Sequence, residues 1–146
     1  MSHENTQRDV RRLADRLVDD VGRQDFAAVS RLLPRMIGVD APEQGLLRPL
    51  CAELVSVIAR AVSARATPDG GDLFTVALAG EADEDVPIDD LQPPVRAVLR
   101  AILAELNQDT EGVVTQLEFI TADPDPGGQV DALIHLVSWA HELPRT

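Results

Sequence analysis

The sequence predicts a mainly all-α protein, a bundle of five to six helices. Apolar residues recur at helical spacing along most of the chain, which is the pattern of amphipathic helices. Hydrophobic content is 45% but aromatic content only 3%, so the core consists mainly of aliphatic side chains. At 146 residues the chain fits one domain that buries roughly two-thirds of its unfolded surface. We therefore expect residues 1–146 to form a single helical domain.

The clearest helix is predicted over residues 93–107. Pro94 suits a first helical turn, where its missing N–H would have no partner in any case. Asn107 suits the left-handed residue that ends a helix. The apolar stripe comprises Val95, Val98, Leu99, Ile102, Leu103 and Leu106.

Three earlier segments also have helical periodicity. The first helix ends at Gly22, and Asp25 caps the second. Pro34 predicts that the second helix ends near Leu33 or kinks there. The third helix has an apolar stripe that comprises Leu47, Leu50, Cys51, Leu54, Val55, Ile58 and Val62. Pro49 interrupts this pattern, so the regular helix is expected to begin there, after a separate turn over residues 42–48. A cysteine on such a stripe is expected to be a buried, inert thiol.

Residues 73–88 interrupt the helical pattern. Phe74, Val76 and Leu78 alternate with smaller residues, which favours a small β-hairpin or an extended insertion. The acidic run over residues 81–85 would form its turn. The competing interpretation is a helical extension over residues 72–79.

Two helices are predicted near the C-terminus. Asp109 or Thr110 caps the first, and a Pro- and Gly-rich break over residues 123–128 precedes the second. The second helix runs from about Gln129 to Leu143, with apolar residues around more than half of its circumference. This helix is therefore either central to the bundle or shared with a partner.

The order of helices suggests an internal duplication. Shifting the chain by about 85 residues aligns Val10 with Val95 and Val29 with Val114. The pseudo-repeats would cover residues 9–66 and 93–143, with residues 67–90 inserted between them. Chance alignment of two amphipathic stripes is the alternative explanation.

The net charge of −12 is unevenly distributed. Residues 1–65 hold ten arginines against nine carboxylates, whereas residues 66–146 hold three against sixteen. The acidic second half would repel nucleic acid and favour a basic protein partner. No apolar run is long enough for a membrane span, and the N-terminus has no signal-peptide pattern, so a cytoplasmic protein is expected.

Polar side chains of the last predicted helix offer the strongest candidate for chemistry. Asp131, His135, Ser138 and Glu142 share one side of it and are acid–base or metal-ligand types. A solvent-exposed face is the simpler interpretation. Arg96 and Arg100 are expected to pair with nearby carboxylates, with anion binding as the alternative. No cofactor or metal motif is present, and the Asp123-x-Asp125 segment is a poor match to a calcium loop.

These observations favour a non-enzymatic protein-interaction or regulatory domain, with a protein partner or a second copy of the chain. Its expected surface combines the last helix and the acidic run, namely Leu136, Trp139, Leu143, Glu81, Asp83, Glu84 and Asp85. One alternative is an acidic decoy that inhibits a basic protein, as antitoxins and immunity proteins do. The other is a metal-dependent enzyme that uses the polar stripe of the last helix.

Overall fold

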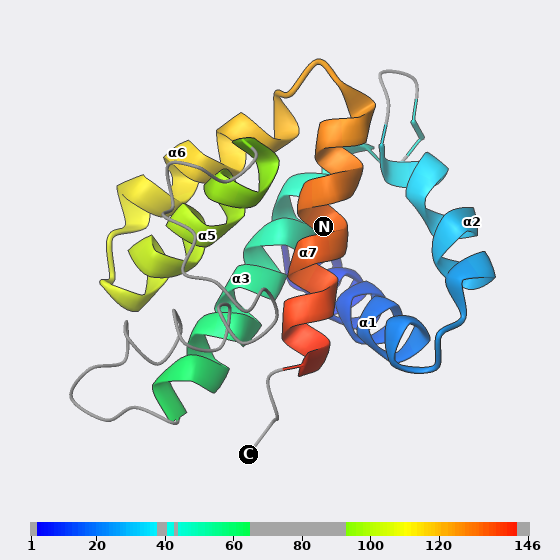
Figure 1. Cartoon of the computed structure of the whole chain (residues 1–146), viewed down its shortest axis with the longest axis horizontal. Coiled ribbons are helices and arrows are strands. Elements are labelled where there is room, and N and C mark those ends of the chain that lie inside the picture. Colours follow the sequence, from blue (N-terminus) through cyan, green and yellow to red (C-terminus); the bar gives the residue numbers. More distant parts are fainter. Residues whose placement is uncertain (1–2, 38–40, 43, 65–92, 143–146) are drawn as a thin grey trace, which may run out of the picture.

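The computed structural model describes residues 3–37, 41–42, 44–64 and 93–142, and these are helical with short connections (Figure 1). The described residues form six α-helices and a 3-10 turn, η1 (Gln44–Leu46). The helices are α1 (His3–Gly22), α2 (Phe26–Met36), α3 (Leu47–Ala64), α5 (Pro93–Leu106), α6 (Thr110–Thr121) and α7 (Pro126–Glu142). No strand occurs within these ranges, which confirms the all-α prediction. The predicted hairpin at 73–88 and insertion at 67–90 lie outside the described residues.

Helices α3 and α7 lie at the centre of the structure. Each contacts α1, α5 and α6 as well as the other. Figure 1 shows α7 crossing in front of α3, with α1 and α2 on one side and the α5–α6 pair on the other. None of the described helices is long and apolar enough to cross a membrane.

The wide apolar surface of α7 is explained by this central position. Leu133 and Leu136 are fully buried, and Trp139 is only 7% exposed. They join a continuous core with residues of α3 and α5, including Leu50, Leu54, Ile58, Val98 and Ile102. Of the two alternatives for this helix, the structure therefore shows the first: α7 is covered by the chain's own helices.

Helix α7 begins at Pro126, earlier than the sequence predicted. Asp125 Oδ1 accepts a hydrogen bond from Gly127 N at 2.9 Å, and Asp123 Oδ1 accepts one from Asp125 N at 2.9 Å. Proline at the first position and carboxylates before it are favourable at a helix N-terminus. These caps outweigh the helix-breaking tendency of the two following glycines, which the prediction had placed in a loop.

Pro34 and Pro49 both lie within helices. Helix α2 does not end at Leu33 but continues through Pro34 to Met36. Turn η1 precedes α3, as the sequence predicted, but α3 begins at Leu47, two residues earlier than expected, so that Pro49 lies in its first turn. Proline is tolerated there because the first backbone N–H groups of a helix have no partner within it.

The α1–α2 and α5–α6 turns have the same geometry. Gln24 and Gln108 both have left-handed backbone conformations, with φ of 59° and 58°. Each is followed by an aspartate that caps the next helix: Asp25 Oδ1 accepts from Ala28 N at 3.1 Å, and Asp109 Oδ1 accepts from Gly112 N at 3.0 Å. The left-handed residue that ends α5 is thus Gln108 and not Asn107. Aligning the two turns requires a shift along the chain that is one residue shorter than the shift that aligns the apolar stripes in the sequence.

Candidate functional site

The surface expected on the last helix is not exposed in the structure. Leu136 is 0% exposed and Trp139 is 7% exposed, so the chain's own helices cover both. Leu143 and the acidic residues Glu81, Asp83, Glu84 and Asp85 lie outside the described residues. A partner surface must therefore be sought elsewhere on the described part of the molecule.

The polar stripe of α7, in contrast, lies at the surface, but its side chains form no cluster of metal ligands. Asp131 and Glu142 are exposed, and His135 and Ser138 are partly buried. His135 Nδ1 lies 2.7 Å from the backbone oxygen of Asp131, and its ring meets Trp139 edge-on with centroids 5.7 Å apart. Within the described residues, no three His, Cys, Asp or Glu side chains converge on a site for a metal ion.

His141, near the end of α7, is exposed in the structure. A β-carbon built on Gly22 would lie 2.7 Å from His141 Cε1, so the imidazole ring packs closely against the end of α1. The absence of a side chain at Gly22 gives this ring its space.

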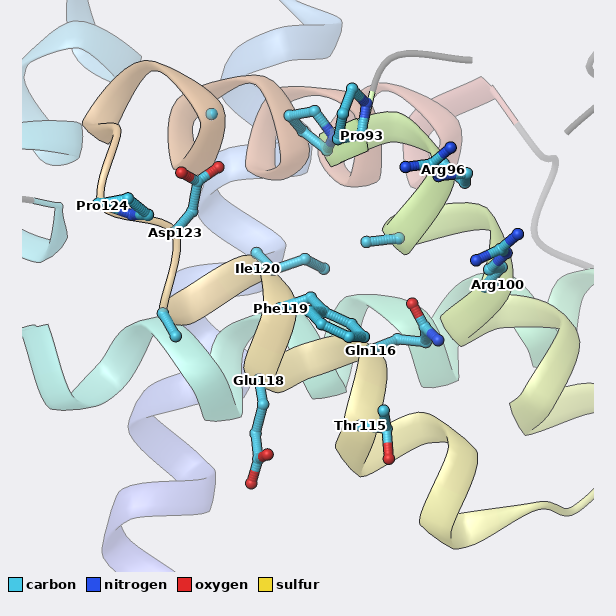
Figure 2. A pocket seen from close by; sticks show the side chains of 14 residues that line it. Pro93, Arg96, Arg100, Thr115, Gln116, Glu118, Phe119, Ile120, Asp123 and Pro124 are labelled. Atoms are coloured by element: carbon cyan, nitrogen blue, oxygen red, sulfur yellow. The ribbon is translucent and has the colours of Figure 1, made fainter. Parts of the chain in front are cut away.

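A groove of about 630 Å³ lies between α5, α6 and the start of α7 (Figure 2). Its apolar surface comes from three elements. Pro93, Pro94 and Ala97 belong to α5, and Phe119 and Ile120 belong to α6. Helix α7 contributes Gly128, and Ala122 and Pro124 lie in the connection before it.

Phe119 is the most unusual residue of this groove. Its side chain is 64% exposed, whereas the neighbouring Ile120 is only 3% exposed and anchors α6 in the core. Phe119 was not among the residues expected at a site, because it lies outside the apolar stripe of its helix. This position could nevertheless have identified Phe119 from the sequence. When the apolar face of an amphipathic helix packs into the core, an aromatic residue on its polar face is left exposed.

The basic side chains of the groove come from one helix. Arg96 and Arg100 lie one turn apart on α5, and Figure 2 shows both projecting on the α5 side of the groove, with Phe119 across from them on α6. The sequence contains no other arginine between Arg65 and Arg145. The second half of the chain therefore concentrates its positive charge beside an apolar surface.

The two carboxylates that line the groove already have other contacts. Glu118 points away from the α5 arginines in Figure 2, and its Oε1 lies 3.7 Å from Arg48 Nη2 of α3. Asp123 accepts a hydrogen bond from the backbone of Asp125 and lies against Gly128. The Asp123-x-Asp125 segment thus caps the first turn of α7.

A second depression, between α1 and α3, is occupied by an ion-pair network. Glu53 Oε1 lies 3.6 Å from Arg11 Nε and 4.0 Å from Arg60 Nη2. Both arginine side chains are largely exposed, with Arg60 also donating from Nε to the backbone oxygen of Ser56 at 3.3 Å. Such exposed pairs typically contribute at most about 1 kcal/mol, and this cluster is explained by packing α1 against α3.

Comparison of the chain with protein families, with curated proteins and with solved structures gave no match.

Proposed function

We propose that this chain is a protein-interaction domain that binds a short segment of a partner protein in the groove between α5, α6 and α7. The observation that carries the proposal is the 64% exposure of Phe119 beside apolar groove residues. Aromatic residues are enriched at the energetic centres of protein interfaces. Covering Phe119 would remove a large apolar surface from water at little cost in side-chain entropy.

The shape of the site favours a polypeptide segment. The groove is bounded by two helices of an antiparallel pair and is about 630 Å³ in volume. Apolar grooves between helices are a common docking site for peptide segments, which insert one or two large side chains. We propose in addition that this binding regulates the partner protein.

Phe119→Ala tests the proposal, and Phe26→Ala provides a matched control. Phe26 begins α2, lies outside the groove and is 60% exposed, close to the value for Phe119. Peptides from a random displayed library should be selected on the full wild-type chain, and their affinities measured for all three proteins. We expect Phe119→Ala to weaken binding by about tenfold or more, because it removes about 1.5 kcal/mol or more of aromatic burial.

Phe26→Ala should bind the selected peptides as the wild type does. Both variants should also keep the wild-type circular dichroism spectrum, since neither side chain is part of the core. Equal affinities for wild type and Phe119→Ala, or selection of no binding peptide, would reject the groove as the interaction site.

We also infer that α1–α2–α3 and α5–α6–α7 derive from duplication of one three-helix unit. The repeated order of helices supports this, and so do the matching turns, where a left-handed glutamine precedes a capping aspartate in both halves. A left-handed non-glycine residue at an equivalent position is a more specific feature than an apolar stripe, because stripes recur in unrelated helices.

A further inference from the structure

We propose that Gln129 is a positioning residue for the groove. Its side-chain amide fixes the connection between α6 and α7 (residues 122–125), which forms one wall of the groove, and binding of the partner segment depends on that wall. This inference rests on the proposed function and adds to it a residue that is not among those lining the groove.

Gln129 is a buried polar residue that joins two helices. It is only 5% exposed and directly follows Gly128, which lines the groove. Its Nε2 donates to the backbone oxygens of Thr121 at 3.0 Å and of Asp123 at 3.1 Å. Carbonyl oxygens only accept hydrogen bonds, so the amide nitrogen and not the amide oxygen must face them. One side chain thus ties the start of α7 to the end of α6 and to the connection.

The two hydrogen bonds of Gln129 reach further along the chain than the caps of the connection do. They join residues eight and six positions apart, whereas Asp123 and Asp125 accept from residues two positions away. The segment that they hold is the wall itself, because Ala122, Asp123 and Pro124 all line the groove. The caps shape the start of α7, and Gln129 fixes the wall between the two helices.

The oxygen of the same amide indicates that Gln129 does more than stabilise the fold. Among the described residues, its Oε1 is buried and has no hydrogen-bond partner. A buried acceptor without a partner costs about as much free energy as two ordinary hydrogen bonds contribute. The amide therefore adds little net stability, and an apolar side chain would fill the same place without that cost. What the amide does supply is a defined position for the wall.

The position of this wall matters for the apolar surface beside it. Figure 2 shows the connection leaving the end of α6 just after Phe119 and Ile120 and leading to the start of α7. Movement of the connection would therefore change the shape of the groove next to Phe119. A wall that is already ordered increases affinity, because the partner does not have to order it on binding.

The test uses two variants that lack the N–H donors of Gln129. Gln129→Met keeps the length of the side chain, and Gln129→Leu provides a second variant in case the first does not fold. The matched control is Leu133→Met, one turn further along α7, where Leu133 is 0% exposed and the exchange nearly conserves volume. Peptides that were selected on the full wild-type chain and that depend on Phe119 serve as the probe for all four proteins.

We expect Gln129→Met and Gln129→Leu to lose about threefold to tenfold in peptide affinity, because the partner must then order the wall. Leu133→Met should bind as the wild type does. The urea midpoints of Gln129→Met and Leu133→Met should be similar, since the amide adds little net stability. Hydrogen exchange, which needs no peptide, should become faster over residues 122–128 in the Gln129 variants and stay unchanged in the rest of the chain.

Three outcomes overturn the inference, and they can be told apart. If both Gln129 variants bind the Phe119-dependent peptides as the wild type does, Gln129 does not position the groove, which is still the interaction site. If the affinity falls together with the urea midpoint and exchange becomes faster throughout the chain, Gln129 has a general role in stability only. If no selected peptide depends on Phe119, the proposed function fails and this inference fails with it.

Discussion

At the scale of single residues, Cys51 and Phe119 show how an apolar stripe predicts burial. Cys51 lies on the stripe of α3 and is 0% exposed, as the sequence predicted. Phe119 is more hydrophobic but lies off the stripe of α6 and is 64% exposed. Position on the helix therefore decided burial in both cases, and hydrophobicity alone would have ranked them in the wrong order.

Burial of Cys51 predicts a loss of stability at alkaline pH. Desolvation raises the pKa of its thiol from 9.0 to about 12. The folded chain therefore keeps the proton while the unfolded chain releases it above about pH 9, so this contribution to stability is complete below pH 9 and decreases as the pH rises. We expect the free energy of unfolding to fall by about 1.4 kcal/mol per pH unit between about pH 9.5 and 11.

The composition of the chain makes this slope assignable to one group. The sequence contains no tyrosine and no lysine, and arginine does not titrate in this range. Urea unfolding of wild type and Cys51→Ala across this pH range provides the measurement. The slope should disappear in Cys51→Ala, and an equal slope in both proteins would show that another group is responsible.

At the scale of elements, the six α-helices of the described residues follow from local sequence patterns, and their ends follow from the chemistry of a few residues. Asp25 and Asp109 were recognisable as caps because their side chains can accept from the first turn of the next helix. The start of α7 was harder to predict from the sequence, because Gly127 and Gly128 taken alone favour a loop. The two glycines are part of α7 because Pro126 and Asp125 together favour the start of a helix more than either glycine favours a loop.

The two left-handed glutamines predict that glycine would stabilise both turns. A left-handed conformation costs a non-glycine residue about 1–2 kcal/mol, part of which glycine loses again through the entropy of the unfolded chain. We expect Gln24→Gly and Gln108→Gly each to raise the free energy of unfolding by about 0.5–1 kcal/mol, measured by urea denaturation. If the halves derive from one unit, the two increments should be equal within error.

Gln7→Gly is the control for these two variants. Gln7 is exposed within α1, where the backbone is right-handed and glycine should destabilise by about 1 kcal/mol. If Gln24→Gly or Gln108→Gly destabilised the chain as much as Gln7→Gly does, the geometry of the turn would not determine which residue is preferred there.

At the scale of the whole molecule, the groove could not be predicted from the sequence. Its residues come from α5, α6 and the start of α7, and no local pattern gives the angle at which these helices meet. Arg96 and Arg100 were recognised as candidates for ion pairing or anion binding, but their position beside Phe119 depends on packing between helices. Conversely, Trp139 was placed at a partner surface because the sequence does not distinguish burial by the same chain from burial by another.

The uneven charge of the chain gives a prediction at this scale that compares two equivalent substitutions. Asp9 and Asp131 are both exposed and both lie in the second turn of a helix, α1 and α7. Residues 1–65 are nearly neutral in sum, whereas residues 66–146 are strongly acidic. Asp131→Asn therefore relieves like-charge repulsion, and Asp9→Asn removes a carboxylate from among Arg8, Arg11 and Arg12.

We expect Asp131→Asn to be the more stable of the two variants at low ionic strength, with each within about 0.5 kcal/mol of wild type. The difference should shrink as the salt concentration rises from about 0.01 M to about 0.15 M, because the screening length falls from about 30 Å to about 8 Å. Urea midpoints at a series of sodium chloride concentrations measure it. A difference that does not depend on salt would mean that local contacts of the two side chains, and not the charge of each half, set their contributions.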